Sequence, residues 1–252
     1  MTIKTRGIVL KRTNFGETDR IVTFYTSTLG KKRAKAIGAR KIRARLGGHL
    51  ELFMLSDLMI AKGKNLDTII SAQVIHAYPN IRTDLHKASF AYFLAELVDK
   101  IVAEELKDTR IFNLLARTLE ILNDQNFSNE SLPILLVAFE MQLLSILGFS
   151  PQMSRCAHCG KTKSRKFGFS AIFGGILCED CLRYDRLATA IDLSEIKAMQ
   201  GLSCLHLAKK LDFSLSFETI ESVTEKLEYF IHFVFEKNIK SLEFIKQIKR
   251  LI

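Results

Sequence analysis

The first 80 residues have the pattern of short β-strands separated by turns. Five runs of β-type residues, at 6–12, 20–26, 33–39, 50–61 and 68–78, are divided by segments rich in glycine, threonine, asparagine and aspartate. In the last run Ile70, Ala72 and Val74 share one face, as in a half-buried strand. Five such strands predict a small OB-type barrel, a fold whose faces and loops commonly bind oligonucleotides. An SH3-like barrel remains an alternative on strand count alone.

After Pro79 the apolar residues recur at helical spacing. Stripes at 90–102, 111–122 and 223–234 predict amphipathic helices. The segment 132–149 is apolar nearly all round, which predicts a central buried helix that ends at Gly148. We therefore predict a multidomain α+β chain. It has an OB-fold domain at 1–80, a helical domain at 81–154 and 191–252, and a cysteine module at 155–190 embedded in that helical domain.

The cysteine module contains two pairs, Cys156 with Cys159 and Cys178 with Cys181, in the spacing C-x2-C-x18-C-x2-C. This spacing is typical of a structural zinc site with four thiolate ligands, and a hairpin around residues 174–175 would join the two knuckles as in a zinc ribbon. Two disulfides or an iron–sulfur cluster are the alternatives. A catalytic zinc is disfavoured because four thiolates leave no open coordination position.

Positive charge is concentrated at the N-terminal end of the chain. The net charge is +10, and residues 1–80 alone hold 15 lysines and arginines against 5 acidic residues. Charge confined to one block favours a polyanionic partner. The segment 29–48 has no acidic side chain, and we predict that its basic residues contact nucleic acid: Lys31, Lys32, Arg33, Lys35, Arg40, Lys41, Arg43 and Arg45. Its four glycines and three large aliphatic residues argue against a helix that inserts into a membrane.

The sequence favours binding over catalysis. The six histidines are scattered, and the tripeptide Gly160–Thr162 lacks the earlier glycine of a phosphate-binding loop. Glu17 and Asp19 have the form of a solvated turn, with a metal-dependent nuclease as the alternative. We expect no enzyme activity, and the absence of a signal-peptide pattern together with paired thiols indicates a cytoplasmic protein.

Several segments in order resemble the bacterial RecO family of recombination mediators. They are GIVLKRTNFGETDRIVTFYT (7–26), Gly30–Lys31, GARK (38–41), Arg45–Leu46, AYFLAELVDK (91–100), LGFSPQMSRCAHCG (147–160), the CEDC pair and KSLEF (240–244). The resemblance covers essentially the whole chain.

This resemblance implies an OB-fold, a helical domain with an embedded zinc module, and a role in DNA repair. It implies binding of single- and double-stranded DNA, strand annealing, and cooperation with RecR and single-strand-binding protein to load RecA, at the nucleoid. Lys31, Arg40, Lys41 and Arg45 match the basic motif of the family. The acidic tail of single-strand-binding protein is expected on the C-terminal lysines, which are Lys237, Lys240, Lys246 and Lys249. An RNA-binding protein of translation or transcription uses the same features and is the alternative function.

Overall fold

A computed structural model describes residues 1–41, 44, 46–104, 106–203 and 215–249. The chain divides into two compact units. The first comprises Met1–Asn129 and the C-terminal segment that begins at Ile239, and the second comprises Glu130–Asn238. The domain boundaries given above stay a prediction.

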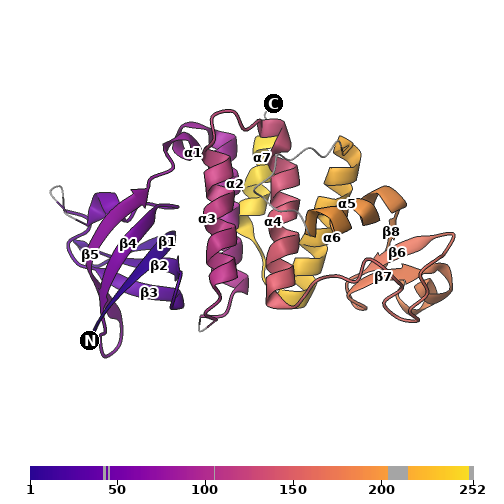
Figure 1. The fold of residues 1–252 in the computed structure, drawn as a ribbon, viewed down its shortest axis with the longest axis horizontal. Coiled ribbons are helices and arrows are strands. Elements are labelled where there is room, and N and C mark those ends of the chain that lie inside the picture. Colours follow the sequence, from indigo (N-terminus) through magenta and orange to yellow (C-terminus); the bar gives the residue numbers. More distant parts are fainter. Residues whose placement is uncertain (42–43, 45, 105, 204–214, 250–252) are drawn as a thin grey trace. The chain divides into compact units, whose positions relative to one another are not determined.

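The first unit begins with a closed five-stranded barrel (Figure 1). Its strands are β1 (Thr2–Phe15), β2 (Asp19–Thr26), β3 (Gly30–Ala36), β4 (Leu55–Ala61) and β5 (Asp67–His76), in the order β1-β2-β3-β5-β4. All neighbours are antiparallel except β3 and β5, which pair in parallel. The barrel interior is filled by apolar side chains, among them Val9, Val22, Phe24, Ala34, Leu58 and Ile60. The predicted OB-fold is confirmed.

The fourth strand begins later than the alternation predicts. A 3-10 turn, η1 (Gly47–His49), occupies the approach to it, and the backbone at Phe53 has a φ of 69°. Phe53 N–H still donates to the Val9 carbonyl, at 2.9 Å, and its ring meets Tyr92 edge-on with centroids 5.0 Å apart. The apolar residues at 50–54 therefore close the barrel as a packed loop, and regular pairing starts at Leu55.

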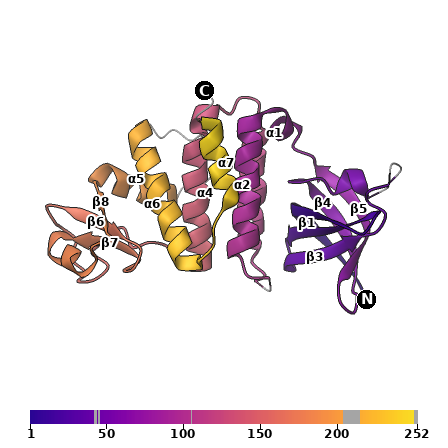
Figure 2. The ribbon, with the colours of Figure 1, turned by 180° about the vertical axis from the view of Figure 1, so that it is seen from behind.

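Among the described residues of the first unit, four α-helices follow the barrel: α1 (Pro79–Thr83), α2 (Leu85–Ile101), α3 (Thr109–Asn123) and α7 (Lys240–Lys249). Asp84 and Asp108 cap α2 and α3 by accepting N–H groups of their first turns, at 2.8–3.1 Å for α2 and 2.8 Å for α3. Figure 2 shows α7 beside α2. Glu96 of α2 accepts the N–H groups of Lys240 and Ser241, at 3.1 and 2.7 Å, and so caps the start of α7.

One cross-strand row of the barrel, which contains Tyr25 and Lys31, contacts these helices. Tyr25 of β2 lies opposite Lys31 of β3, and both side chains are buried. The Tyr25 hydroxyl lies 3.2 and 3.1 Å from the carbonyls of Leu106 and Asp108, which precede α3. The Lys31 ammonium donates to the carbonyl of Asp99 in the last turn of α2. A cation is favourable there because the last carbonyls of a helix lack partners within the helix.

The second unit is built around α4 (Leu132–Leu147), which follows the 3-10 turn η2 (Asn129–Ser131). Gly148 ends α4 in the left-handed region, with a φ of 83°, as predicted. The segment Asn129–Leu147 is long and apolar enough to cross a membrane, yet 56% of its most apolar window is buried inside the protein. Packing on α5 (Leu193–Ser203) and α6 (Phe217–Phe235) accounts for its apolar surface.

The cysteine module lies between α4 and α5 in the chain. It has a three-stranded sheet in the order β7-β6-β8, made of β6 (Phe167–Ser170), β7 (Gly175–Cys178) and β8 (Thr189–Ile191), with a 3-10 segment η3 (Glu179–Tyr184). Gly174 at the end of the β6–β7 turn has a φ of 68°, which the predicted hairpin requires. Behind the sheet, Phe169 meets Phe230 of α6 with ring centroids 5.8 Å apart.

Candidate nucleic-acid interface and metal site

Strand alternation decides which basic residues of the barrel face outward. In β2 and β3 the even-numbered Val22, Phe24 and Ala34 fill the interior, so odd-numbered residues lie on the outer face. Cross-strand pairing then gives two rows beyond the Tyr25 row. The first row is Lys11, Thr23 and Arg33, and the second is Thr13, Ile21 and Lys35.

A loop after β3 extends this outer face. Asp19, at the start of β2, accepts the Gly38 N–H at 2.8 Å and pairs with the Lys35 ammonium at 2.9 Å. These contacts hold the pKa of Asp19 down at about 2, with the Gly38 hydrogen bond the larger cause and the Lys35 bond the next. Arg40 continues the contact by donating to the carbonyl of Gly16 at 2.9 Å. Asp19 thus orders the loop, which leaves Arg40 and Lys41 exposed at the end of the face.

We call this surface the basic face: Lys11, Arg33, Lys35, Arg40 and Lys41, with the ring of Phe15. Phe15 is 47% exposed, and the Lys35 ammonium lies 5.1 Å from its ring centroid. The other three aromatic side chains nearby that could stack on bases are all buried: Phe24 in the interior, Tyr25 against the helices and Phe53 in the closing loop. Of these four rings, Phe15 is the one that is exposed.

Four predicted contact residues lie elsewhere or outside the described residues. The Lys31 side chain is buried between β3 and α2, so its ammonium is not exposed to a ligand. Lys32 pairs with Phe24 and so leaves β3 on the side opposite Arg33. Arg43 and Arg45 lie outside the described residues. Lys11 was missed because it stands in a separate strand, and pairing in register with Thr23 brings it to the face.

The four C-terminal lysines are divided between the two units. Lys237 is exposed and follows α6 in the second unit, whereas Lys240 is exposed at the start of α7 in the first unit. Lys246 and Lys249 belong to α7, but their side chains lie outside the described residues. A shared site for these residues stays a prediction.

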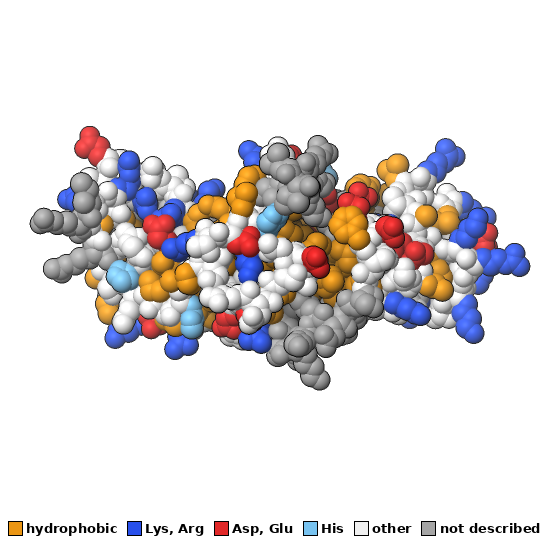
Figure 3. Space-filling model, turned by 90° about the horizontal axis from the view of Figure 1, so that it is seen from above, with side chains coloured by type: hydrophobic (Ala, Val, Ile, Leu, Met, Phe, Trp, Pro, Cys, Tyr) orange, Lys and Arg blue, Asp and Glu red, His pale blue; other side chains and the backbone are white. Residues whose placement is uncertain are grey.

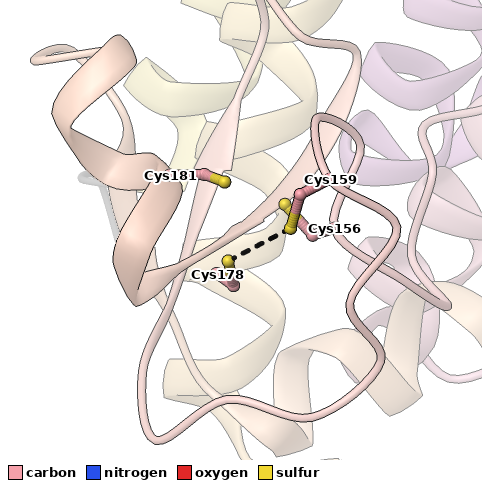
Figure 4. A group of neighbouring side chains, drawn as sticks. All are labelled: Cys156, Cys159, Cys178 and Cys181. Carbon is pink, nitrogen blue, oxygen red and sulfur yellow. Dashed lines mark hydrogen bonds between the residues drawn. The ribbon is translucent and has the colours of Figure 1, made fainter.

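The two cysteine pairs converge at one point (Figure 4). One ligand atom from each of Cys156, Cys159, Cys178 and Cys181 lies within 4.8 Å of all the others, and the Cys159 and Cys178 sulfurs are 3.6 Å apart. Sulfurs at about 2.3 Å from one ion in a tetrahedron lie roughly 3.8 Å from one another. The donor set and its spacing therefore fit a metal ion with four sulfur ligands.

Local backbone structure favours the thiolate form of one cysteine of this cluster, Cys156. Gly160, with a φ of 77°, donates to the Cys156 carbonyl at 2.9 Å and closes the first knuckle. Burial opposes ionisation of Cys156, but N–H groups of the knuckles outweigh it and lower the pKa of this thiol to about 6. Burial and the neighbouring thiols raise the pKa of Cys181 to about 12. His158 lies beside the cluster, with Nδ1 at 3.5 Å from the Cys181 sulfur.

The fold and the cysteine cluster together define an OB-fold protein with a helical part and an embedded four-cysteine module. Two family models match nearly the whole chain: "Recombination protein O N terminal" over residues 1–78 and "Recombination protein O C terminal" over residues 82–243. The chain belongs to the RecO family of DNA repair and recombination proteins.

Relatives match over most of their own length as well. The chain is 35% identical to the DNA repair protein RecO of Roseiflexus sp. (strain RS-1), over 99% of this chain and 87% of the relative. It is 31% identical to that of Alkaliphilus metalliredigens, over 98% of this chain and 100% of the relative. For Acetivibrio thermocellus the identity is 34%, over 99% and 98% of the two chains.

Proposed function

We propose that this protein is a non-enzymatic DNA-binding mediator of recombination. It binds single- and double-stranded DNA, anneals complementary strands, and helps RecA load onto DNA coated with single-strand-binding protein. The observation that supports this best is the basic face, because five exposed or half-exposed cations and an exposed phenylalanine lie on the outer face of an OB-fold barrel. Such a surface follows a phosphate backbone with its charges while bases stack on the ring.

Salt dependence tests the electrostatic part. If the five cations of the basic face engage about five phosphates, the log–log salt slope on single strands is about −3.5, and affinity falls roughly a hundredfold between 50 and 200 mM salt. Fluorescence anisotropy of a labelled oligonucleotide measures this slope. A slope near zero would remove the proposal.

Charge reversal locates the site. Arg33→Glu combined with Lys41→Glu should weaken binding to all sequences alike, because phosphate contacts carry no base information. Both side chains are exposed. Arg82→Glu combined with Lys107→Glu is the matched control, since it makes the same change of net charge at two exposed cations of the same unit that lie outside the barrel. Equal losses in control and test variants would show a general charge effect and contradict this location.

Mediator activity needs its own assay. Complementary strands coated with single-strand-binding protein should anneal faster when this protein is added, and RecA should displace the coat faster when RecR is also present. Removing the acidic tail of single-strand-binding protein should abolish the acceleration. Acceleration of RNA annealing alone would favour the translation or transcription role instead.

We further propose that the cysteine cluster holds one structural Zn²⁺. Zinc prefers four thiolates in a tetrahedron, and with all four positions taken by protein it supplies folding energy and no open site for chemistry. Metal analysis of reduced, purified protein should find about one equivalent of zinc. Less than half an equivalent, or iron in its place, would contradict the assignment.

A further inference from the structure

The cysteine module carries an exposed stack of aromatic rings. The His158 ring lies on the Tyr184 ring with centroids 4.6 Å apart and planes at 26°, and Phe173 meets His158 edge-on at 5.3 Å. Tyr184 is 51% exposed, and His158 is exposed as well. The stack has its origin in the fold, because His158 lies within the first knuckle and Tyr184 ends η3 after the second.

A guanidinium belongs to this stack. The Arg183 guanidinium carbon lies 5.0 Å from the Tyr184 ring centroid, and its Nη2 donates to the Tyr184 hydroxyl at 3.1 Å. Arg183 is exposed. An aromatic ring with a neighbouring guanidinium offers a π-surface and a positive charge together, which is the combination that binds unpaired bases and their phosphates.

The charge of the module agrees with a nucleic-acid ligand. Residues 151–190 contain 7 lysines and arginines against 3 acidic residues. Two of those acids already have partners within the module. Asp185 is buried and accepts a hydrogen bond from the Ser170 hydroxyl at 2.6 Å, and Asp180 forms an ion pair with Lys161 at 2.8 Å. In Figure 3 lysine and arginine side chains gather at the right of the view, over this module.

We propose that the surface formed by His158, Arg183 and Tyr184 is a second binding site for single-stranded nucleic acid, on which an unpaired base continues the ring stack. The site rests on the proposed DNA-binding function and adds to the basic face of the barrel. It reads no sequence, because every base has a face that can stack.

A tryptophan reporter tests the site directly, since the chain has no tryptophan. Tyr184→Trp is made in the full-length, zinc-loaded protein, with Tyr229→Trp as the matched control, because Tyr229 is 41% exposed on α6. Titration with oligo(dT) should quench the Trp emission of the first variant. The oligo(dT) concentration at half-maximal quenching should equal the midpoint measured by anisotropy of the labelled strand. The control should keep its emission. Quenching by polyglutamate and not by oligo(dT) would overturn the proposal in favour of an acidic protein partner.

Affinity gives the second readout. Tyr184→Ala should weaken binding about tenfold, the loss of one stacked base, whereas Tyr184→Phe should bind within about twofold of the parent. Zinc content is measured for each variant, so that loss of the metal is separated from loss of the ring. Normal binding by Tyr184→Ala together with unquenched Tyr184→Trp would overturn this site alone. If the parent protein itself fails to bind the oligonucleotide, the proposed function fails.

Discussion

Lys31 and Arg33 lie two residues apart on the same face of β3, and we predict opposite consequences when each is replaced by methionine. The Lys31 side chain is 8% exposed, and its ammonium donates to the Asp99 carbonyl and lies 4.0 Å from the Asp99 carboxylate. Burial lowers the pKa of this lysine, because the ammonium loses part of its hydration in the folded protein. Arg33 is exposed at the middle of the basic face.

The magnitudes follow from these surroundings. A hydrogen bond to a charged group contributes about 1.5–3 kcal/mol, and the desolvation of a buried ammonium offsets part of it. Lys31→Met should therefore cost about 1–2 kcal/mol of unfolding free energy, because methionine keeps most of the packed stem. At a urea dependence of about 2 kcal/mol/M, the midpoint moves by roughly 0.5–1 M. Arg33→Met should stay within about 0.5 kcal/mol of the parent.

DNA binding should show the reverse order. Arg33→Met removes one phosphate contact, so the log–log salt slope should become less negative by about 0.7 and affinity should fall several-fold. Lys31→Met should bind as the parent does when both are fully folded. Urea denaturation followed by circular dichroism and oligonucleotide anisotropy measure the two effects on the same preparations. A stable Lys31→Met protein with a reduced salt slope would refute the assignment of Lys31 to the barrel–helix contact.

Three further predictions concern titratable groups in the helices. Partial burial alone would raise the pKa of Glu96, but its hydrogen bonds to Lys100 and to the start of α7 lower this pKa to about 2. The stabilisation by Glu96 is therefore full above about pH 4.5 and is lost as the pH falls toward 2. In thermal melts at different pH values, Glu96→Gln should lose less stability than the parent between pH 4.5 and pH 2. Lys226 of α6 and Glu195 of α5 form a buried pair at 2.8 Å, so Lys226→Met should cost about 3–5 kcal/mol in urea denaturation, and adding Glu195→Gln should restore much of it. Glu140 is fully buried, and burial raises its pKa to about 8. The folded protein therefore keeps a proton on Glu140 that the unfolded protein loses above about pH 4.5. The free energy of unfolding should fall as the pH rises from 5 to 8, and Glu140→Gln should show no such fall.

Much of the fold could be predicted because the patterns are local. Strand alternation and turn residues identified the barrel, a helix apolar on all sides identified α4, and the C-x2-C spacing identified the cysteine cluster. The late start of β4 could not be predicted, since Phe53 has the side chain of a strand residue and takes a positive φ only because the loop closes the barrel against Tyr92. The capping of α7 by Glu96 was equally hidden, because it joins residues 144 apart in sequence.

The candidate metal site was predictable for the same reason, and its surroundings were not. Each pair of cysteines is local, so the sequence shows the four ligands directly. The stack of His158 on Tyr184 depends on how the two knuckles meet in space, and a single sequence carries no signal for it. The sequence shows His158 only as one of several scattered histidines. In the structure its ring stacks on Tyr184, and its Nδ1 lies 3.5 Å from the Cys181 sulfur.

A basic run on a strand overstates the number of cations that reach a ligand. Alternation sends Lys32 to the side of β3 opposite Arg33 and Lys35, and the row nearest the helices takes Lys31 out of solvent. Two of the four charges that stand together in the sequence thus leave the face, whereas Lys11 joins it from β1. The number of phosphate contacts should therefore be estimated from the cations in the outward-facing rows of the barrel, and not from the number of basic residues that stand together in the sequence. Each outward residue of the basic face should change the salt slope by about 0.7 when neutralised, and Lys31 should not change it.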